Sequence, residues 1–136
     1  MVEVTIFLKA DVNPTEDEEK VRTAIDNVLG NASITVKQAQ RGSTLFAKAK
    51  GHDSLVKLRN LLRNDRIRDA ARRILFKSIR GKTISFYLNK QVAFVVHVSF
   101  SEEIAESPLG PIHFTIETEN PSLLVEWLAE KTKDRR

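Results

Sequence analysis

The sequence contains no cysteine, only three histidines and no apolar run long enough to cross a bilayer. Without cysteine, disulfide bonds, thiolate catalysis and cysteine-ligated zinc are all excluded. A membrane-spanning helix needs about twenty consecutive apolar residues, so we expect no membrane partner. The opening residues have strand character and lack the basic stretch and cleavage site of a signal peptide. Together these absences predict a cytoplasmic protein.

Catalytic motifs are missing as well. The sequence has no phosphate-binding loop, no dinucleotide-binding glycine pattern and no nucleophile elbow. His52 lies in a predicted loop, whereas His97 and His113 lie in predicted strands, and no carboxylate stands at a spacing that would complete a metal site. We therefore expect a non-enzymatic protein with no cofactor, no metal and no small-molecule substrate.

What is present indicates a single domain over residues 1–136. A hydrophobic content of 41% and a charged content of 29% are typical of a globular protein. Alternating apolar residues predict strands, and apolar residues at intervals of three to four predict helices. The strands are expected at 2–8, 34–37, 45–49, 84–88, 92–100 and 112–116, and the helices after Pro14, at 54–63, at 66–79 and from Pro121. The order βαββααβββα predicts an α+β fold with a mainly antiparallel sheet of five to six strands, covered by three to four helices.

Two local signals give sharper expectations. Thr15 and Glu18 have the spacing of a capping box, so Thr15 is expected to cap the first helix. A three-residue loop at 89–91 would pair Leu88 with Val92 and place the apolar residues of both flanking strands on the same face. The last two strands before residue 101 are therefore predicted to form a hairpin.

A strongly basic segment runs from Lys57 to Lys82. It holds ten basic and two acidic residues, whereas the rest of the chain holds 12 basic and 16 acidic residues. Six of its cations recur at intervals of three or four when Ala70 fills the gap, which places them on one face of a helix. A break at Asn64-Asp65 would divide this face into two patches.

These cations form a predicted RNA interface in which each side chain contacts a phosphate. The alternative interpretation is a solvated helix face. The predicted interface consists of Arg59, Arg63, Arg66, Arg73, Lys77 and Arg80, together with Lys48 and Lys82.

The second face of the predicted sheet carries aromatic residues between lysines. Phe7, Phe46, Tyr87 and Val95 occupy strand positions opposite the apparent core face. Such side chains can stack on nucleic-acid bases, or they can be buried against a helix or a second subunit. We predict a homodimer that buries these four residues on a two-fold axis.

Four stretches of the sequence are similar to a known family: Pro14–Asp17, Asp69–Arg72, Phe86–Ala93 and Ser107–Ile112. The chain resembles a small archaeal family of uncharacterised proteins that carry labels such as predicted RNA-binding protein or predicted exosome subunit. The resemblance implies a fold similar to that of the ribosomal large-subunit protein that binds 5S RNA, and structured RNA as the partner. It implies no catalytic residues. A dimeric protein-interaction or structural module without RNA binding is the alternative function.

Overall fold

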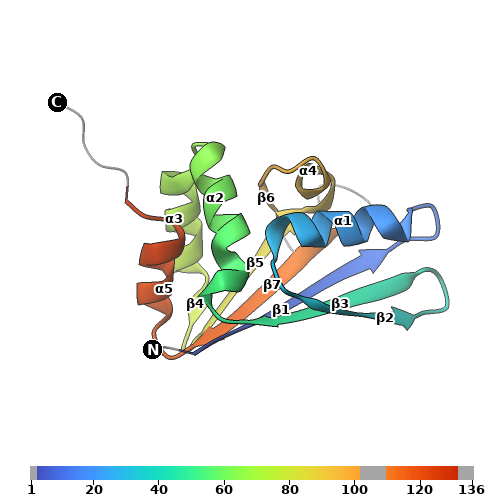
Figure 1. The fold of residues 1–136 in the computed structure, drawn as a ribbon, viewed down its shortest axis with the longest axis horizontal. Helices are drawn as coiled ribbons and strands as arrows, with labels where there is room; N and C mark the ends of the chain where they lie inside the picture. The colour runs from blue at the N-terminus through green and yellow to red at the C-terminus, as the bar shows by residue number, and fades with distance from the viewer. Residues whose placement is uncertain (1–2, 102–109, 132–136) are drawn as a thin grey trace.

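Strands with a buried residue at every second position form a sheet, and the helices pack over it (Figure 1). The computed structural model of the chain describes residues 3–101 and 110–131. The first half of the motif at Ser107–Ile112, residues 107–109, therefore lies outside the described residues. The elements are β1 (Val4–Val12), α1 (Glu18–Val28), β2 (Ser33–Gln38), β3 (Ser43–Lys50), the 3-10 helix η1 (His52–Leu55), α2 (Val56–Asn64), α3 (Arg68–Lys77), β4 (Ile79–Arg80), β5 (Thr83–Asn89), α4 (Lys90–Phe94), β6 (Phe100–Ser101), β7 (Pro111–Thr118) and α5 (Pro121–Leu128).

The described strands form one antiparallel sheet in the order β2-β3-β1-β7-β5-β4, with β6 paired to the far end of β5. The predicted α+β class with a mainly antiparallel sheet is confirmed. The sheet has seven strands, two of them only two residues long, and five α-helices accompany it. Both numbers exceed the prediction, because short elements leave little periodic signal in the sequence.

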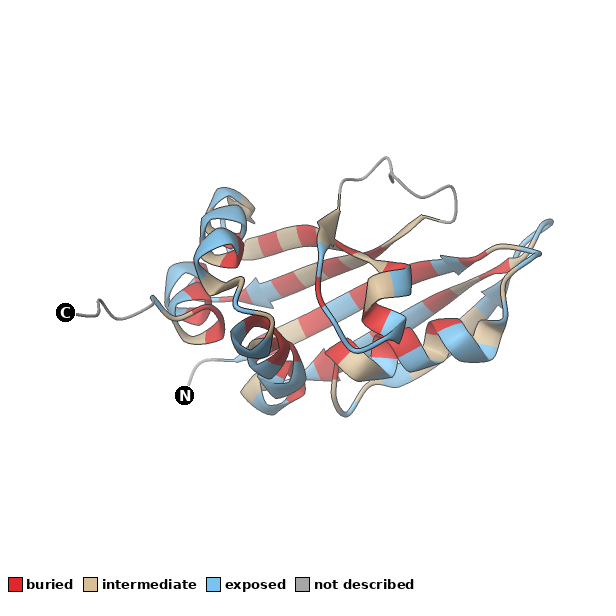
Figure 2. Ribbon diagram, turned by 90° about the horizontal axis from the view of Figure 1, so that it is seen from above, coloured by how far each residue is buried: buried red, intermediate tan, exposed pale blue. Residues whose placement is uncertain are grey.

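All five helices lie on one face of the sheet (Figure 1). Along β1, Val4, Ile6 and Leu8 are buried beneath the helices, and the residues between them are turned to the other side. Buried and more exposed residues alternate in the same way along β3, β5 and β7 (Figure 2). The opposite side, here called the open sheet face, is covered by none of the helices in residues 3–101 and 110–131. Among the described residues, no helix is long and apolar enough to span a membrane.

The predicted break in the basic segment is confirmed, because α2 ends at Asn64 and α3 begins at Arg68. Arg66 takes the left-handed conformation at this corner, with φ of 59°, which is uncommon for a residue other than glycine. Asp65 accepts hydrogen bonds of 2.9 Å from the backbone N–H of Val98 and the Nδ1 of His97. Burial raises the pKa of Asp65, but these two bonds outweigh it and hold the pKa below its ordinary value.

The predicted strand at 92–100 is wrong. Asn89 ends β5, and its side chain accepts a hydrogen bond of 2.9 Å from the N–H of Val92, which caps the short helix α4. The position beside β5 is taken by β7, which pairs Phe86 with Phe114 and stacks the two rings 5.0 Å apart. Only β6 remains of the predicted strand, so the expected pairing of Leu88 with Val92 does not form.

The predicted capping box is also wrong, since Asp17 and not Thr15 caps α1, by accepting from the N–H of Glu19 at 2.9 Å. The preceding residue, Glu16, is engaged elsewhere. Its carboxylate accepts a hydrogen bond of 2.8 Å from the ammonium of Lys90. Lys90 also donates a hydrogen bond of 2.6 Å to the backbone carbonyl of Asp11. Lys90 is 3% exposed. A buried cation needs such partners, because burying an unpaired charge is costly.

This buried ion pair predicts a large effect of removing the Glu16 charge. Glu16→Gln removes the carboxylate charge that lies 2.8 Å from the buried Lys90 ammonium and should lower the free energy of unfolding by about 3 kcal/mol. Urea denaturation at neutral pH gives the value. The control is Glu18→Gln, which removes only a partly exposed i,i+4 pair with Arg22 and should cost less than about 0.5 kcal/mol.

The same pair predicts a pH dependence. Burial raises the pKa of Glu16, but hydrogen bonds from Asn13 and Lys90 hold it below its ordinary value in the folded protein. The stabilisation is therefore complete above the ordinary glutamate pKa of about 4.3 and is lost as the pH falls from there through the lowered pKa. The difference between wild type and Glu16→Gln should shrink over that acidic range. A difference independent of pH would contradict this assignment.

Candidate nucleic-acid interface

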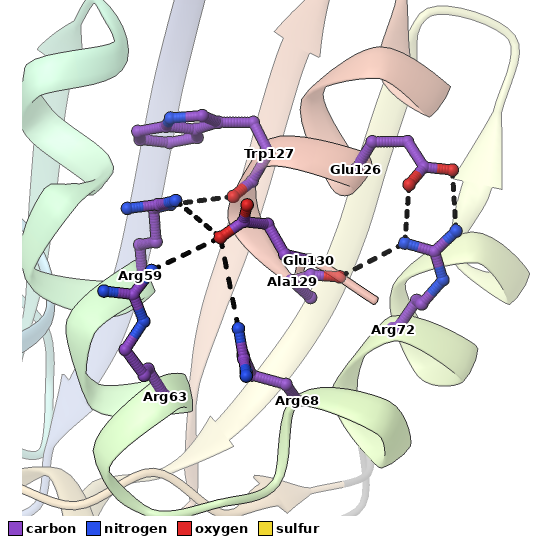
Figure 3. Close-up of polar contacts among 8 residues, drawn as sticks. All are labelled: Arg59, Arg63, Arg68, Arg72, Glu126, Trp127, Ala129 and Glu130. Carbon is purple, nitrogen blue, oxygen red and sulfur yellow. Dashed lines mark hydrogen bonds and ion pairs between the residues drawn. The ribbon is translucent and has the colours of Figure 1, made fainter. Parts of the chain in front are cut away.

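The basic segment forms α2 and α3, and both helices contact α5. Three arginines of the segment surround one carboxylate oxygen just beyond α5, the Oε1 of Glu130 (Figure 3). The guanidinium nitrogens of Arg59, Arg63 and Arg68 lie 2.8, 3.3 and 4.0 Å from this oxygen. Arg59 also donates to the carbonyl of Trp127 at 2.8 Å. These contacts join the end of α5 to α2 and to the start of α3.

A second arginine contact lies one turn further along α3. Arg72 donates two hydrogen bonds of 2.6 Å to the two carboxylate oxygens of Glu126, and a third of 3.3 Å to the carbonyl of Ala129 (Figure 3). The paired geometry is the strongest form of arginine–carboxylate contact. Hydrogen bonds from Arg72 hold the pKa of Glu126 below its ordinary value.

The remaining cations of α3 point outward. Ala71 and Leu75 are buried, so the opposite side of the helix is exposed. Within residues 3–101 and 110–131, Arg66, Arg73 and Lys77 have no carboxylate within 4.0 Å. The α3 outer surface is defined here by these three residues.

The guanidinium of Arg80 contacts the backbone at the end of α3. One of its guanidinium nitrogens donates to the carbonyls of Lys77 and Ile79 at 2.9 and 2.8 Å, which caps the end of α3. Lys82, in the turn that follows, forms an exposed ion pair of 3.0 Å with Glu119. Its charge is therefore balanced by a close carboxylate.

The predicted stripe of six cations is thus divided. Arg59 and Arg63 are turned toward Glu130, whereas Arg66, Arg73 and Lys77 remain on the α3 outer surface. Lys48 lies on β3 and faces the open sheet face, on the other side of the sheet from the helices, so the structure does not bring it to the other predicted residues.

The open sheet face holds three of the four residues predicted for a dimer interface. Phe7 and Phe46 are 37% and 40% exposed, and Tyr87 lies two strands away from Phe7 on β5. Val95 is not among them, because it follows α4 and does not belong to a strand.

Sequence reasoning missed the two acids that bind the basic segment. Glu126 and Glu130 stand four residues apart near the end of the chain, which indicates only that they share a side of α5. Their arginine partners are 54 to 71 residues away in the sequence. No local pattern could have assigned them.

A family model described as RNA binding matches residues 5–118. A UPF0201 protein of Sulfolobus acidocaldarius is 44% identical over 127 residues, which cover 93% of this chain and 88% of the relative. A UPF0201 protein of Saccharolobus solfataricus is 42% identical over 129 residues, which cover 95% and 89% of the two chains.

Solved structures show the same fold. The crystal structure of a UPF0201 protein from Methanococcus jannaschii has a TM-score of 0.82 and 33% identity, and covers 92% of this chain and 98% of that one. A DUF54 protein from Methanothermobacter thermautotrophicus has a TM-score of 0.60 over 96% and 95% of the two chains. At 19% identity it shows the fold alone.

The Glu130 cluster predicts a salt-dependent contribution to stability. Glu130→Gln keeps the size of the side chain but removes the charge shared by three arginines, so the free energy of unfolding should fall by about 1 kcal/mol at low salt. The loss should nearly vanish at about 1 M salt, because added ions screen exposed charges. Urea denaturation at two salt concentrations measures both values.

Glu119→Gln is the matched control, because it removes one acid paired with one exposed lysine. It should change stability little at either salt concentration. Equal effects of the two substitutions would show that the three arginines do not hold α5 through Glu130.

Proposed function

The chain belongs to the UPF0201 family of archaeal proteins, and we propose that it is a non-enzymatic, cytoplasmic protein that binds RNA through the α3 outer surface. The description of the matching family model supports RNA as the partner. The exposed cations of α3 support the location. Their side chains would contact phosphates, which hold an RNA in place without reading its sequence.

One observation carries this proposal. Although the acids of α5 neutralise several arginines of the basic segment, they leave Arg66, Arg73 and Lys77 without a carboxylate within 4.0 Å in the described part of the chain. Arg66 sits at the α2–α3 corner, and the other two lie one helical turn apart on α3. Exposed cations gain from counterion release when they meet a phosphate backbone.

Structured RNA is the proposed partner class. The cations of the α3 outer surface are held on one side of a helix. A folded RNA presents its phosphates at a fixed spacing, so its backbone can contact such a surface. The family resemblance noted in the sequence implies a fold like that of the 5S-binding ribosomal protein, and structured RNA is the partner class that follows from this expectation. We expect weak, sequence-independent affinity, since few cations take part.

The direct test is charge reversal on the α3 outer surface. The triple variant Arg66→Glu, Arg73→Glu and Lys77→Glu should lose most hairpin-RNA affinity at low salt. For wild type, the log of the affinity should fall with the log of the salt concentration by about 0.9 for each phosphate contact, and the variant should lose most of that slope. Fluorescence anisotropy with a labelled hairpin across a salt series measures both.

The matched control reverses three exposed cations outside the basic segment, Lys20, Lys37 and Arg41. It changes the net charge by the same amount, so a general electrostatic effect would weaken both variants equally. An equal loss of hairpin-RNA affinity in the two variants would show that α3 is not the binding site. If wild type does not bind the hairpin at low salt, the proposed function is wrong.

A homodimeric interaction module is the second candidate function. It is favoured by the exposure of Phe7 and Phe46 on a sheet face that none of the described helices covers. Two-fold pairing would bury the same surface on both copies. Light scattering behind size exclusion at about 50 µM tests it: this function requires a dimer that Phe46→Glu converts to a monomer.

A further inference from the structure

We propose that the open sheet face is a binding site for single-stranded RNA, in which Phe7 and Phe46 stack on bases while Lys9 and Lys48 contact phosphates. This inference rests on the proposed function, because it assigns a second class of RNA to a second surface of the same protein. The two surfaces lie on opposite sides of the sheet. Each can therefore be altered without the other.

The register of β1 and β3 creates an alternating group of four side chains at the centre of this face. Phe7 lies directly opposite Lys48, and Lys9 lies directly opposite Phe46. The ammonium of Lys48 stands 5.4 Å from the centre of the Phe7 ring. Each phenylalanine ring therefore has two lysine neighbours, one two residues away on its own strand and one directly opposite on the paired strand. Stacking platforms with adjacent cations are the arrangement that binds single strands, because every base has a face that can stack.

The same row of the sheet continues across β7 and β5. His113 is paired with Lys9 on one side and with Tyr87 on the other. The rings of His113 and Tyr87 stack with centroids 4.4 Å apart and an angle of 18° between their planes. Ser85 Oγ lies 2.7 Å from His113 Nε2 and fixes the orientation of the imidazole. This row provides an aromatic track that runs across the strands beside Phe46 and Lys9.

The charges of the face favour a polyanion over a second copy of the chain. Its described strand residues include four lysines, Lys9, Lys37, Lys48 and Lys50, and two acids, Asp11 and Glu117. The acids lie toward opposite ends of β1 and β7, and Asp11 accepts a hydrogen bond from Thr44 at 3.0 Å. The group formed by Phe7, Lys9, Phe46 and Lys48 holds two cations and no acid, although Asp11 lies beside Lys9, Tyr87 and His113. Face-to-face pairing of two copies would bring like charges together, whereas an RNA strand supplies the opposite charge.

Exposure supports the same conclusion. Phe7 and Phe46 keep 37% and 40% of their surface open to solvent, although phenylalanine is usually buried. Lys9 and Lys48 between them are exposed. A strand of RNA laid over this group would cover the rings with bases and keep the lysines at its phosphates.

The test separates stacking from charge. Binding of a labelled 12-nucleotide oligouridine is measured by fluorescence anisotropy for wild type and for the double variant Phe7→Ala, Phe46→Ala, which keeps every lysine. The affinity should fall about 25-fold or more, since removal of one stacking ring costs about fivefold or more. Binding of a hairpin RNA to the same variant should not change.

Phe94→Ala is the matched control, because Phe94 is also 37% exposed and also lies near a lysine, Lys20, but stands on α4 away from the sheet. It should leave oligouridine binding unchanged. A second double variant, Lys9→Ala with Lys48→Ala, should lower the salt slope for oligouridine by about 1.4, since each single-strand phosphate contact contributes about 0.7. Equal oligouridine affinities of the phenylalanine variant and the control would overturn the proposal.

Photo-crosslinking of the unmodified protein gives an answer that does not depend on the folding of any variant. With 4-thiouridine in the oligonucleotide, crosslinked peptides should contain β1 and β3. Crosslinks confined to α2 and α3 would overturn the proposal, and so would a dimer at about 50 µM that Phe46→Glu converts to a monomer. Wild type that binds the hairpin but not the single strand would refute this inference alone, whereas binding of neither RNA would refute the proposed function as well.

Discussion

The separation of the sheet into a covered face and an open face is the constraint on which the rest of the structure depends. In β1, β3, β5 and β7, apolar residues recur at every second position. Because successive residues of a strand point to opposite sides, nearly all large aliphatic side chains of these strands lie on one face of the sheet. Burying that face requires helices over it, and all five lie there (Figure 1). The basic segment must therefore fold above the sheet, while the lysines and aromatic rings of β1 and β3 remain below it.

Above the sheet, the packing of α5 determines which cations remain available to a partner. Arg59, Arg63 and Arg68 converge on Glu130, and Arg72 binds Glu126. These arginines serve mainly to position a helix, and exposed ion pairs of this kind contribute modestly to stability. The cations on the far side of α3 have no such contact in the described chain. The division between structural and available arginines follows from the rotation of α3, which buries Ala71 and Leu75.

Much of the fold could be predicted from local patterns, and the errors have a common physical cause. The period of two identified the long strands, and Asn64-Asp65 correctly marked the break between α2 and α3. Residues 92–100 were predicted to be a strand because apolar residues occupy every second position, at Val92, Phe94, Val96, Val98 and Phe100. The outcome depends instead on a side-chain cap by Asn89 and on burial of Lys90 against Glu16, which is 74 residues away in the sequence. Tertiary contacts of this kind override local propensity.

The candidate site was predictable to the same extent. The spacing of the cations correctly indicated a helical surface, but the acids that neutralise part of it come from the other end of the chain. The face shared by Phe7, Phe46 and Tyr87 followed from alternation alone, whereas Val95 was assigned to it through the mistaken strand. Pairing of Phe46 with Lys9 required the register of β1 and β3, which a single sequence does not give.

The central claim is that the α3 outer surface binds RNA. The most direct measurement is an NMR titration of the isotope-labelled protein with a hairpin RNA at low salt, read from the backbone amide signals. We expect shifts that are concentrated at Arg66, Arg73 and Lys77 and that are reversed by added salt. Amide signals of α3 that do not move at a several-fold excess of RNA would contradict it.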